Sequence, residues 1–300
     1  MRVLLAGGSG FLGSHLTAHL RTRGHDVTRF VRRTPTGSDE VEWQPADGVV
    51  PREAVAAADV VVNLAGSPTA GNPHSSRWAR ELRDSRVTTT QLLAEEIAAT
   101  GGRAALVAGN GISFYGDHGD TLVTEDSESR GDALLTRVTR EWQAVTSSAE
   151  SAGARVCVLR TAPVMDRRSM PLKALAPLFS LGLGGRLGSG RQHMPQISLR
   201  DWVGATTHLV EHETASGPFN LCCEQTPTNA EFTQALASAL HRPAFLPAPA
   251  PVLRLAAGEL APELLGSVNA RPAALLASGY EFRDPDVTEV VASGLARRDP

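Results

Sequence analysis

The sequence has three cysteines, two tyrosines and a single lysine among its 300 residues. The cysteines are Cys157, Cys222 and Cys223, and no two of them have the C-x-x-C spacing. Neither a disulfide framework nor a cysteine-based zinc site is therefore expected. Residues 208–212 spell H-x-x-E-H, which puts two histidines on one helical face, but Glu213 adds little as a third ligand, so no metal is expected.

Long apolar runs and an excess of charge of either sign are also absent. The formal net charge of −3 gives no reason to expect nucleic acid as a partner. No run approaches the length of roughly 20 residues that a membrane helix needs, and the short apolar stretch at the start is unlike a signal peptide. We expect a cytoplasmic protein with a small-molecule substrate and without nucleic acid or membrane as a partner, and a homodimer is compatible with these features.

What the sequence does have is a glycine-rich segment near its start. Residues 2–6 are apolar enough for a buried strand, residues 11–23 have helical periodicity, and four glycines lie between or just inside them. Glycines in that context permit a tight turn, let the backbone approach a pyrophosphate and let the helix pack against the strand. The residues expected to contact a dinucleotide are Gly7, Gly10, Phe11, Leu12 and Gly13.

Two arginines indicate which dinucleotide is bound. Residues 26–31 read as the second strand, and Arg32 and Arg33 follow it directly, about twenty residues beyond the glycines. An acidic residue at this place would bind the ribose 2′-hydroxyl, whereas an arginine accommodates a 2′-phosphate. The sequence therefore predicts NADP(H) as the cofactor.

Strands and helices alternate along the first half of the chain. Strands are expected at residues 58–64, 103–108 and 154–160, with helices at 77–100 and 131–152 between them. This alternation predicts an α/β fold with a doubly wound parallel sheet. Ligands bind at the carboxyl ends of such strands. There the small residues Leu64, Ala65 and Gly66 are expected to lie along the cofactor.

The loop at residues 109–116 follows the next strand and is the expected centre of chemistry. The candidates in it are Asn110, Ser113 and Tyr115. The domain division expected from the composition is a dinucleotide-binding core at residues 1–165, substrate-lobe elements interleaved with that core at 166–242, and a small helical domain at 243–300. The last begins at a proline-rich linker.

With these residues placed, the chain resembles the extended short-chain dehydrogenase/reductase superfamily, whose core is a Rossmann fold. Within it, the chain is most similar to the atypical nucleoside-diphosphate-sugar epimerase-like family with its small C-terminal domain. Besides the glycine loop, the residues that carry the resemblance are Asn63-Leu64-Ala65-Gly66, Arg77-Trp78, Ser85-Arg86, Tyr115-Gly116, Thr124-Glu125, Arg160-Thr161, the glycines of 182–190 with Gln192, Arg242-Pro243, Gly258-Glu259, Leu264-Leu265 and Gly279.

The chain departs from the superfamily in its catalytic residues. The usual chemistry of the superfamily needs a Tyr-x-x-x-Lys pair, in which lysine lowers the pKa of the tyrosine that transfers the proton. The residues four positions beyond the two tyrosines are Gly119 and Asp284, and the single lysine is Lys173. The resemblance also implies a serine near the end of the preceding strand, which falls near Asn110 or Gly111 in this sequence; Ser113 is close but aligns less well. Without the pair, proton transfer would need Tyr115, a substrate group or water, and Tyr115 is the candidate among the side chains.

The resemblance implies an NADP(H)-binding oxidoreductase or epimerase that acts on a small carbonyl- or hydroxyl-bearing molecule without the usual pair. Two alternatives stay open at this point. One is an isomerase, cyclase or lyase that reuses the pocket without hydride transfer, and the other is a protein that senses NADP(H) without turnover.

Overall fold

The computed structural model describes residues 1–296, which form two compact units. The first unit comprises residues 1–110, 138–159 and 203–218, and the second comprises 111–137, 160–202 and 219 onward. Residues 111–137 thus belong to the second unit, whereas the predicted core ran from 1 to 165. The last four residues of the predicted C-terminal domain lie outside the described part of the chain.

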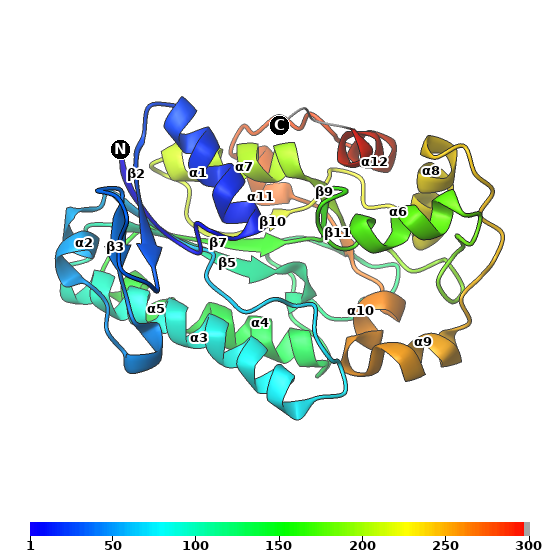
Figure 1. Cartoon of the computed structure of the whole chain (residues 1–300), viewed down its shortest axis with the longest axis horizontal. Helices are drawn as coiled ribbons and strands as arrows, with labels where there is room; N and C mark the ends of the chain where they lie inside the picture. Colours follow the sequence, from blue (N-terminus) through cyan, green and yellow to red (C-terminus); the bar gives the residue numbers. More distant parts are fainter. Residues whose placement is uncertain (297–300) are drawn as a thin grey trace. The chain divides into compact units, whose positions relative to one another are not determined.

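A seven-stranded sheet is the central feature (Figure 1), and its order is β10-β7-β5-β4-β1-β2-β3. The pairings from β3 through β5 are all parallel. The order reverses at β1, which has β2 on one side and β4 on the other, and such a switch point is where doubly wound sheets bind ligands. The predicted fold class is confirmed. The strands are β1 (Arg2–Ala6), β2 (Asp26–Val31), β3 (Glu40–Glu42), β4 (Val60–Asn63), β5 (Ala105–Gly111), β7 (Val156–Thr161) and β10 (Gly217–Leu221).

Helices cover both faces of the sheet: α1 and α7 lie on one side, and α3 and α5 on the other (Figure 1). The buried strand residues Leu4, Val61 and Leu106 pack against Leu93 and Ile97 of α3 in one apolar core. Burial on both faces explains why these strands read as continuous apolar runs. The helices of this part of the chain are α1 (Phe11–Thr22), η1 (Pro45–Asp47), α2 (Arg52–Ala57), α3 (Ser76–Ala99), α4 (Leu134–Ala144), α5 (Ser147–Ser151) and α7 (Leu199–Glu211).

The single helix predicted at residues 131–152 is wrong, because the structure has two helices there. Between α4 and α5, the buried Thr146 donates from Oγ1 to the carbonyl of Gln143 at 2.8 Å and to a carboxylate oxygen of Glu150 at 3.0 Å. A threonine hydroxyl that bonds to nearby groups in this way competes with regular helix hydrogen bonds. The helical period predicted the position of this segment but not its interruption.

The second unit consists of short strands and helices around two apolar clusters. One cluster joins Leu172 and Phe179 of α6 to Phe232 of α8 and Val291 of α12. The other includes Tyr115 and the neighbouring Ile112. The elements are η2 (Ile112–Phe114), β6 (Leu122–Val123), β8 (Val164–Met165), α6 (Leu172–Ser180), β9 (Ile197–Ser198), α8 (Asn229–Ala239), α9 (Ala250–Ala257), η3 (Gly258–Leu260), α10 (Ala261–Leu265), β11 (Asn269–Ala270), α11 (Ala273–Ala277) and α12 (Val287–Leu295).

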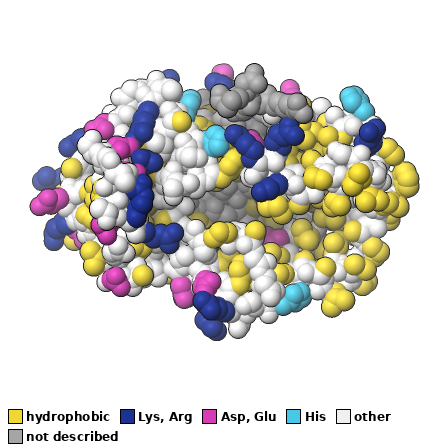
Figure 2. All heavy atoms as spheres, viewed as in Figure 1, with side chains coloured by type: hydrophobic (Ala, Val, Ile, Leu, Met, Phe, Trp, Pro, Cys, Tyr) yellow, Lys and Arg dark blue, Asp and Glu magenta, His cyan; other side chains and the backbone are white. Residues whose placement is uncertain are grey.

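Exposed apolar side chains gather over α6, α9 and the segment that precedes α9 (Figure 2). The most exposed are Leu181, Phe245 and Leu255, at 74%, 70% and 79% of their full areas. No helix in the described part of the chain is long and apolar enough to cross a bilayer.

A buried carboxylate fixes the start of α7 within the second unit. Asp201 is 0% exposed, and its carboxylate accepts the hydroxyl of Tyr280 at 2.9 Å and the backbone N–H groups of Arg283 and Asp284 at 2.9 and 2.8 Å. Hydrogen bonds to a charged group contribute more to stability than neutral ones, and losing them leaves buried donors without partners.

We expect Asp201→Ala to lower the free energy of unfolding by roughly 3 kcal/mol or more, because three donors lose their common acceptor. Urea unfolding followed by circular dichroism measures the change. Asp126→Ala is the control, since Asp126 is exposed. Equal stability of the two variants would contradict this role for Asp201.

Candidate functional site

The glycine loop after β1 lies directly against the chain that leaves β4. Gly7 has a φ of +82°, and a Cβ placed on it would lie 2.6 Å from the carbonyl carbon and oxygen of Leu64 and 2.8 Å from the nitrogen of Ala65. Only glycine fits both the conformation and the space. The backbones after two neighbouring parallel strands are therefore in contact at the switch point.

Two other glycines of the loop have different roles: Gly13 allows close packing, and Gly10 leaves space for a ligand. A Cβ on Gly13 would lie 2.2 Å from the carbonyl oxygen of Gly7, so this position needs glycine for the helix to approach the loop. Gly10 caps α1 with an ordinary φ of −73°, and a Cβ there would meet only the Gly7 oxygen, at 3.3 Å. No side chain caps α1, and its first turn contains no acidic residue. This surface fits an anion such as a pyrophosphate. Phe11 and Leu12 in the same turn are half-buried.

Asn63 holds the turn that contains Leu64, Ala65 and Gly66. Its side-chain oxygen accepts the N–H of Ala65 at 3.0 Å, and its amide nitrogen donates to Thr90 Oγ1 at 2.8 Å. Trp142 donates to the same Thr90 oxygen at 2.6 Å. Asn63 and Thr90 are both 0% exposed. A buried polar network thus holds the end of β4, which the sequence predicts to lie along a cofactor.

Arg86 lies beside this turn, on α3. Its side chain approaches the position of a Cβ on Gly66 to 3.3 Å, and its guanidinium lies 5.5 Å from the Trp142 ring centre. It donates to the carbonyl of Leu82 and to Thr69 Oγ1. Burial lowers its pKa to about 10. No carboxylate in the described part of the chain pairs with it, so it is suited to hold a negative group at the strand end.

The two arginines after β2 have different surroundings. Arg33 makes a bidentate pair with Glu40, at 2.8 and 2.7 Å, and this pair together with Thr36 lowers the pKa of Glu40 to about 2. Arg29 also donates to Glu40, at 3.0 Å. Arg32 is exposed, and no described group pairs with its side chain. Arg33 therefore fastens its own loop, and Arg32 is the arginine available to a ligand.

Tyr115 is fully buried in the second unit. Its hydroxyl donates to Asn220 Oδ1 at 2.7 Å and accepts from a guanidinium nitrogen of Arg160 at 2.8 Å. Burial raises the pKa of Tyr115 to about 12, although Arg160 acts in the opposite direction. Because the proton of the hydroxyl is already donated inside the unit, this geometry does not support the predicted role of Tyr115 as a proton donor to a substrate.

The other two residues predicted for chemistry also have protein partners. Asn110, at the end of β5, is buried and donates from Nδ2 to the carbonyl of Thr139 at 3.1 Å. Ser113 is half-buried and donates to Glu263 Oε2 at 2.5 Å. The sequence did not predict Glu263 as the partner of Ser113. It lies 150 positions away, and the only nearby signal was the Leu264-Leu265 pair.

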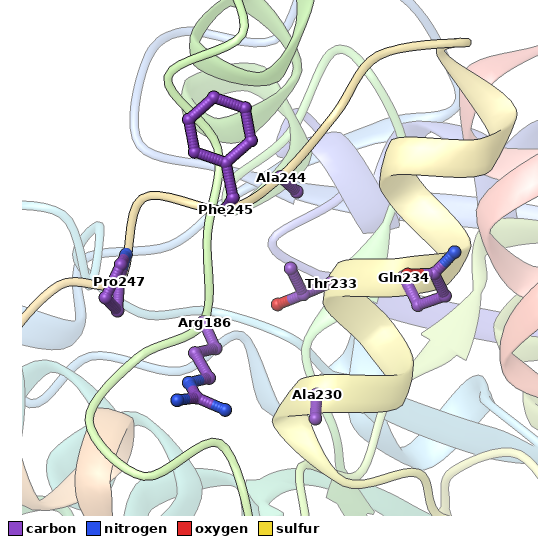
Figure 3. Close-up of a pocket in the computed structure, with 7 residues that line it drawn as sticks. All are labelled: Arg186, Ala230, Thr233, Gln234, Ala244, Phe245 and Pro247. Atoms are coloured by element: carbon purple, nitrogen blue, oxygen red, sulfur yellow. The ribbon is translucent and has the colours of Figure 1, made fainter.

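A shallow pocket of about 250 Å³ lies elsewhere in the second unit, between α8 and two adjoining segments (Figure 3). It contains none of the residues predicted for a site. Its lining consists of Arg186, Ala230, Thr233, Gln234, Ala244, Phe245 and Pro247.

The H-x-x-E-H segment lies on α7, where the rings of His208 and His212 are 5.1 Å apart. Glu211 between them points to other partners, Arg23 and His25, at 2.9 and 2.8 Å. Within residues 1–296, no three His, Cys, Asp or Glu side chains are grouped so that they could hold a metal ion.

Comparison with known proteins agrees with this geometry. A model of the NAD dependent epimerase/dehydratase family matches residues 3–222. This chain belongs to that family. A second model, for a domain of unknown function (DUF1731), matches residues 248–293 of this family member and so covers most of the predicted C-terminal domain.

Relatives of this epimerase-family protein match it along almost its whole length. The Epimerase family protein MT2273 of Mycobacterium tuberculosis is 40% identical over 98% of each chain. Human Epimerase family protein SDR39U1 is 34% identical over 96% of this chain and 97% of its own. A crystal structure of human SDR39U1 (isoform 2) with NADPH has a TM-score of 0.84, with 32% identity over 97% of this chain and 98% of that chain. The family inferred from the sequence motifs is confirmed.

We expect Tyr115→Phe to lower the free energy of unfolding by roughly 1–3 kcal/mol, because Arg160 and Asn220 lose a partner in a buried site. Urea unfolding monitored by circular dichroism gives the change. Phe114→Leu serves as a comparison that keeps the hydroxyl, since Phe114 contributes its ring to Arg160 at 3.7 Å but no hydrogen bond. An unchanged stability in Tyr115→Phe would mean that the buried hydrogen bonds contribute nothing.

Proposed function

We propose that this protein binds NADP(H) and uses it for oxidoreduction or epimerisation of a small molecule with a carbonyl or hydroxyl group. The observation that carries the proposal is the packing of Gly7 against Leu64 and Ala65 with Gly10 left open at the start of α1. The 32% identity to human SDR39U1, whose crystal structure contains NADPH, supports the same cofactor.

The residues present fit this cofactor. The N-terminal turn of α1 beside Gly10 would hold the pyrophosphate, and the backbone of residues 64–66 would lie along the nicotinamide half. Arg86, which has no carboxylate partner in the described part of the chain, would add positive charge at that strand end. When bound, the dinucleotide supplies or accepts a hydride.

Arg32 accounts for the choice of NADP(H) over NAD(H). It follows β2 directly, is exposed, and lies outside the ion pairs that occupy Arg29 and Arg33. A charge-assisted contact to a 2′-phosphate contributes roughly 1.5–3 kcal/mol. Because Arg33 is committed to Glu40, we assign the phosphate contact to Arg32 alone.

The overall proposal is tested by following NADPH absorbance with the purified protein and a panel of aldehydes, ketones and dicarbonyls. We expect at least one of them to be reduced with consumption of NADPH. Tight NADPH binding without consumption of any of them would favour a sensor or a non-redox isomerase or lyase. Absence of binding would overturn the cofactor assignment itself.

Gly10→Val should remove NADPH binding while leaving the melting temperature close to that of the native protein. The backbone angles of Gly10 suit any residue, and its side chain would project into the space assigned to the pyrophosphate. Gly13→Ala is the contrasting variant and should melt at a lower temperature, because its methyl group overlaps the Gly7 carbonyl. Calorimetric titration with NADPH and a thermal melt separate the two effects, and undiminished binding by Gly10→Val would show that the loop is only structural.

Arg32→Ala should weaken NADPH binding about tenfold or more and leave NADH binding nearly unchanged, since only NADPH carries the 2′-phosphate. Arg33→Ala is matched in chemistry but should affect both cofactors equally, through the loop that Glu40 holds. Calorimetry with each dinucleotide measures the ratio. The assignment fails if Arg32→Ala and Arg33→Ala lower the ratio of NADPH affinity to NADH affinity by the same factor.

A further inference from the structure

Two segments of the second unit run side by side although they are far apart in the sequence. The N–H of Ala248 donates to the carbonyl of Arg186 at 2.9 Å, and the carbonyl of Ala248 accepts the N–H of Gly188 at 2.9 Å. The N–H of Leu246 donates to the carbonyl of Gly184 at 3.2 Å. These bonds join the loop after α6 to the segment that precedes α9, so side chains of both segments lie on one continuous surface.

Large apolar side chains are exposed on this surface (Figure 2). The helix α9 has no buried residue, and its Val252 and Leu255 are both exposed, three positions apart on one side of the helix. Exposed apolar side chains that gather in one place mark an interaction surface, whereas isolated ones need no explanation. The apolar surface, as the set is called below, consists of Leu181, Leu183, Phe245, Leu246, Val252 and Leu255.

All the charged residues in the two segments that form the apolar surface are positive. Residues 167–200 and 241–258 contain eight arginines and lysines and no aspartate or glutamate, in a chain with a net charge of −3. An apolar surface bordered by cations alone is complementary to a partner that is both apolar and anionic. Four of the cations are exposed and have no carboxylate partner in the described part of the chain: Lys173, Arg186, Arg242 and Arg254.

A second copy of this chain does not complement the apolar surface. In a symmetric contact the same patch meets itself, so Arg186 and Arg254 of one copy would approach the same cations of the other. Neither segment contains an acidic residue that could pair with them. Like charges brought together in an interface oppose association, so the charge pattern favours a different partner.

The apolar side chains project outward and do not line a groove. The pocket beside Phe245 has a volume of only about 250 Å³, and the Phe245 ring points away from the other residues that line it (Figure 3). A partner helix would need a groove that receives its apolar face. Contact with the surface of a bilayer instead needs apolar side chains that protrude among cations, which is the arrangement seen here.

We propose that the apolar surface binds this protein reversibly to a bilayer that contains anionic lipids. Phe245 and Leu255 enter the boundary between headgroups and acyl chains, while Lys173 and Arg254 contact the lipid phosphates. The proposal concerns where the protein is held and does not depend on the NADP(H) function proposed above.

This proposal departs from the expectation that no membrane is a partner. That expectation rested on the net charge of the whole chain and on the lack of a run long enough to span a bilayer. Neither criterion detects a surface that folding assembles from two separate segments, and binding at the surface of a bilayer needs no spanning helix.

The first test is flotation of the purified full-length protein with two kinds of vesicle, one of phosphatidylcholine alone and one of equal parts phosphatidylcholine and phosphatidylglycerol. We expect binding to the mixed vesicles, little binding to phosphatidylcholine alone, and release by added salt, because salt screens the attraction between cations and headgroups. Absence of binding to the mixed vesicles, or equal binding to both kinds, overturns the proposal.

Two double variants test the two contributions separately. Lys173→Gln combined with Arg254→Gln should weaken binding to the mixed vesicles about tenfold or more, since each cation near an anionic surface contributes about fivefold. Phe245→Ser combined with Leu255→Ser should also weaken it about tenfold or more, because apolar area no longer leaves water. All four side chains are exposed, so the melting temperatures should stay close to that of the native protein. Native-like binding by either double variant overturns the proposal.

The matched controls are Arg80→Gln and Val49→Ser, which remove an exposed cation and an exposed apolar side chain from the first unit. Both should bind the mixed vesicles as the native protein does. If they lose as much binding as the double variants, vesicle binding is not a property of the apolar surface and the proposal fails.

Two further measurements identify other occupants of the apolar surface. Light scattering shows whether the native protein is a dimer that Phe245→Ser with Leu255→Ser converts to a monomer, in which case a second copy covers the surface and the proposal is overturned. An amphipathic peptide of glutamate and leucine serves as the probe for an acidic protein partner. Binding of this peptide without binding to the mixed vesicles would favour such a partner and likewise overturn the proposal.

Discussion

The contact between Gly7 and the backbone of Leu64 and Ala65 is the constraint on which the candidate site depends. It brings together the chain after β1 and the chain after β4 at the place where the strand order reverses. No side chain other than hydrogen is tolerated at Gly7, because both the space and the positive φ exclude it. Asn63 and Thr90 keep the facing turn in place, so the shape of the site depends on backbone packing and on these two buried polar side chains.

The sequence predicted this part well because its signals are local. The order strand, glycines, helix lies within the first 24 residues, and each glycine has a backbone reason that can be stated without knowing the fold. Arg32 and Arg33 show the limit of what such local signals can predict. Their position after β2 was predicted, but Glu40, which occupies Arg33, lies beyond a loop whose path the sequence does not specify. A charged side chain is available to a ligand only if no other residue of the folded protein pairs with it, and a sequence motif does not show such ion pairs.

The partners of the predicted catalytic residues were harder to predict for a related reason. The tyrosine that the motif suggested is enclosed by Arg160 and Asn220, which come from distant parts of the chain. Glu263 lies in a segment that matches only a domain of unknown function. A pair separated by 150 positions leaves no spacing pattern in the sequence, so it is visible only after folding.

The buried Asp201 has a consequence for how the protein is made. Its three partners, Tyr280, Arg283 and Asp284, are synthesised 79 to 83 residues after it. Until they arrive, a carboxylate destined for the interior has none of these donors, and burying it is strongly unfavourable. The second unit therefore completes its folding only after residue 284 has been synthesised, whereas the first unit is complete at residue 218. A nascent chain stalled before residue 280 is a natural target for chaperones.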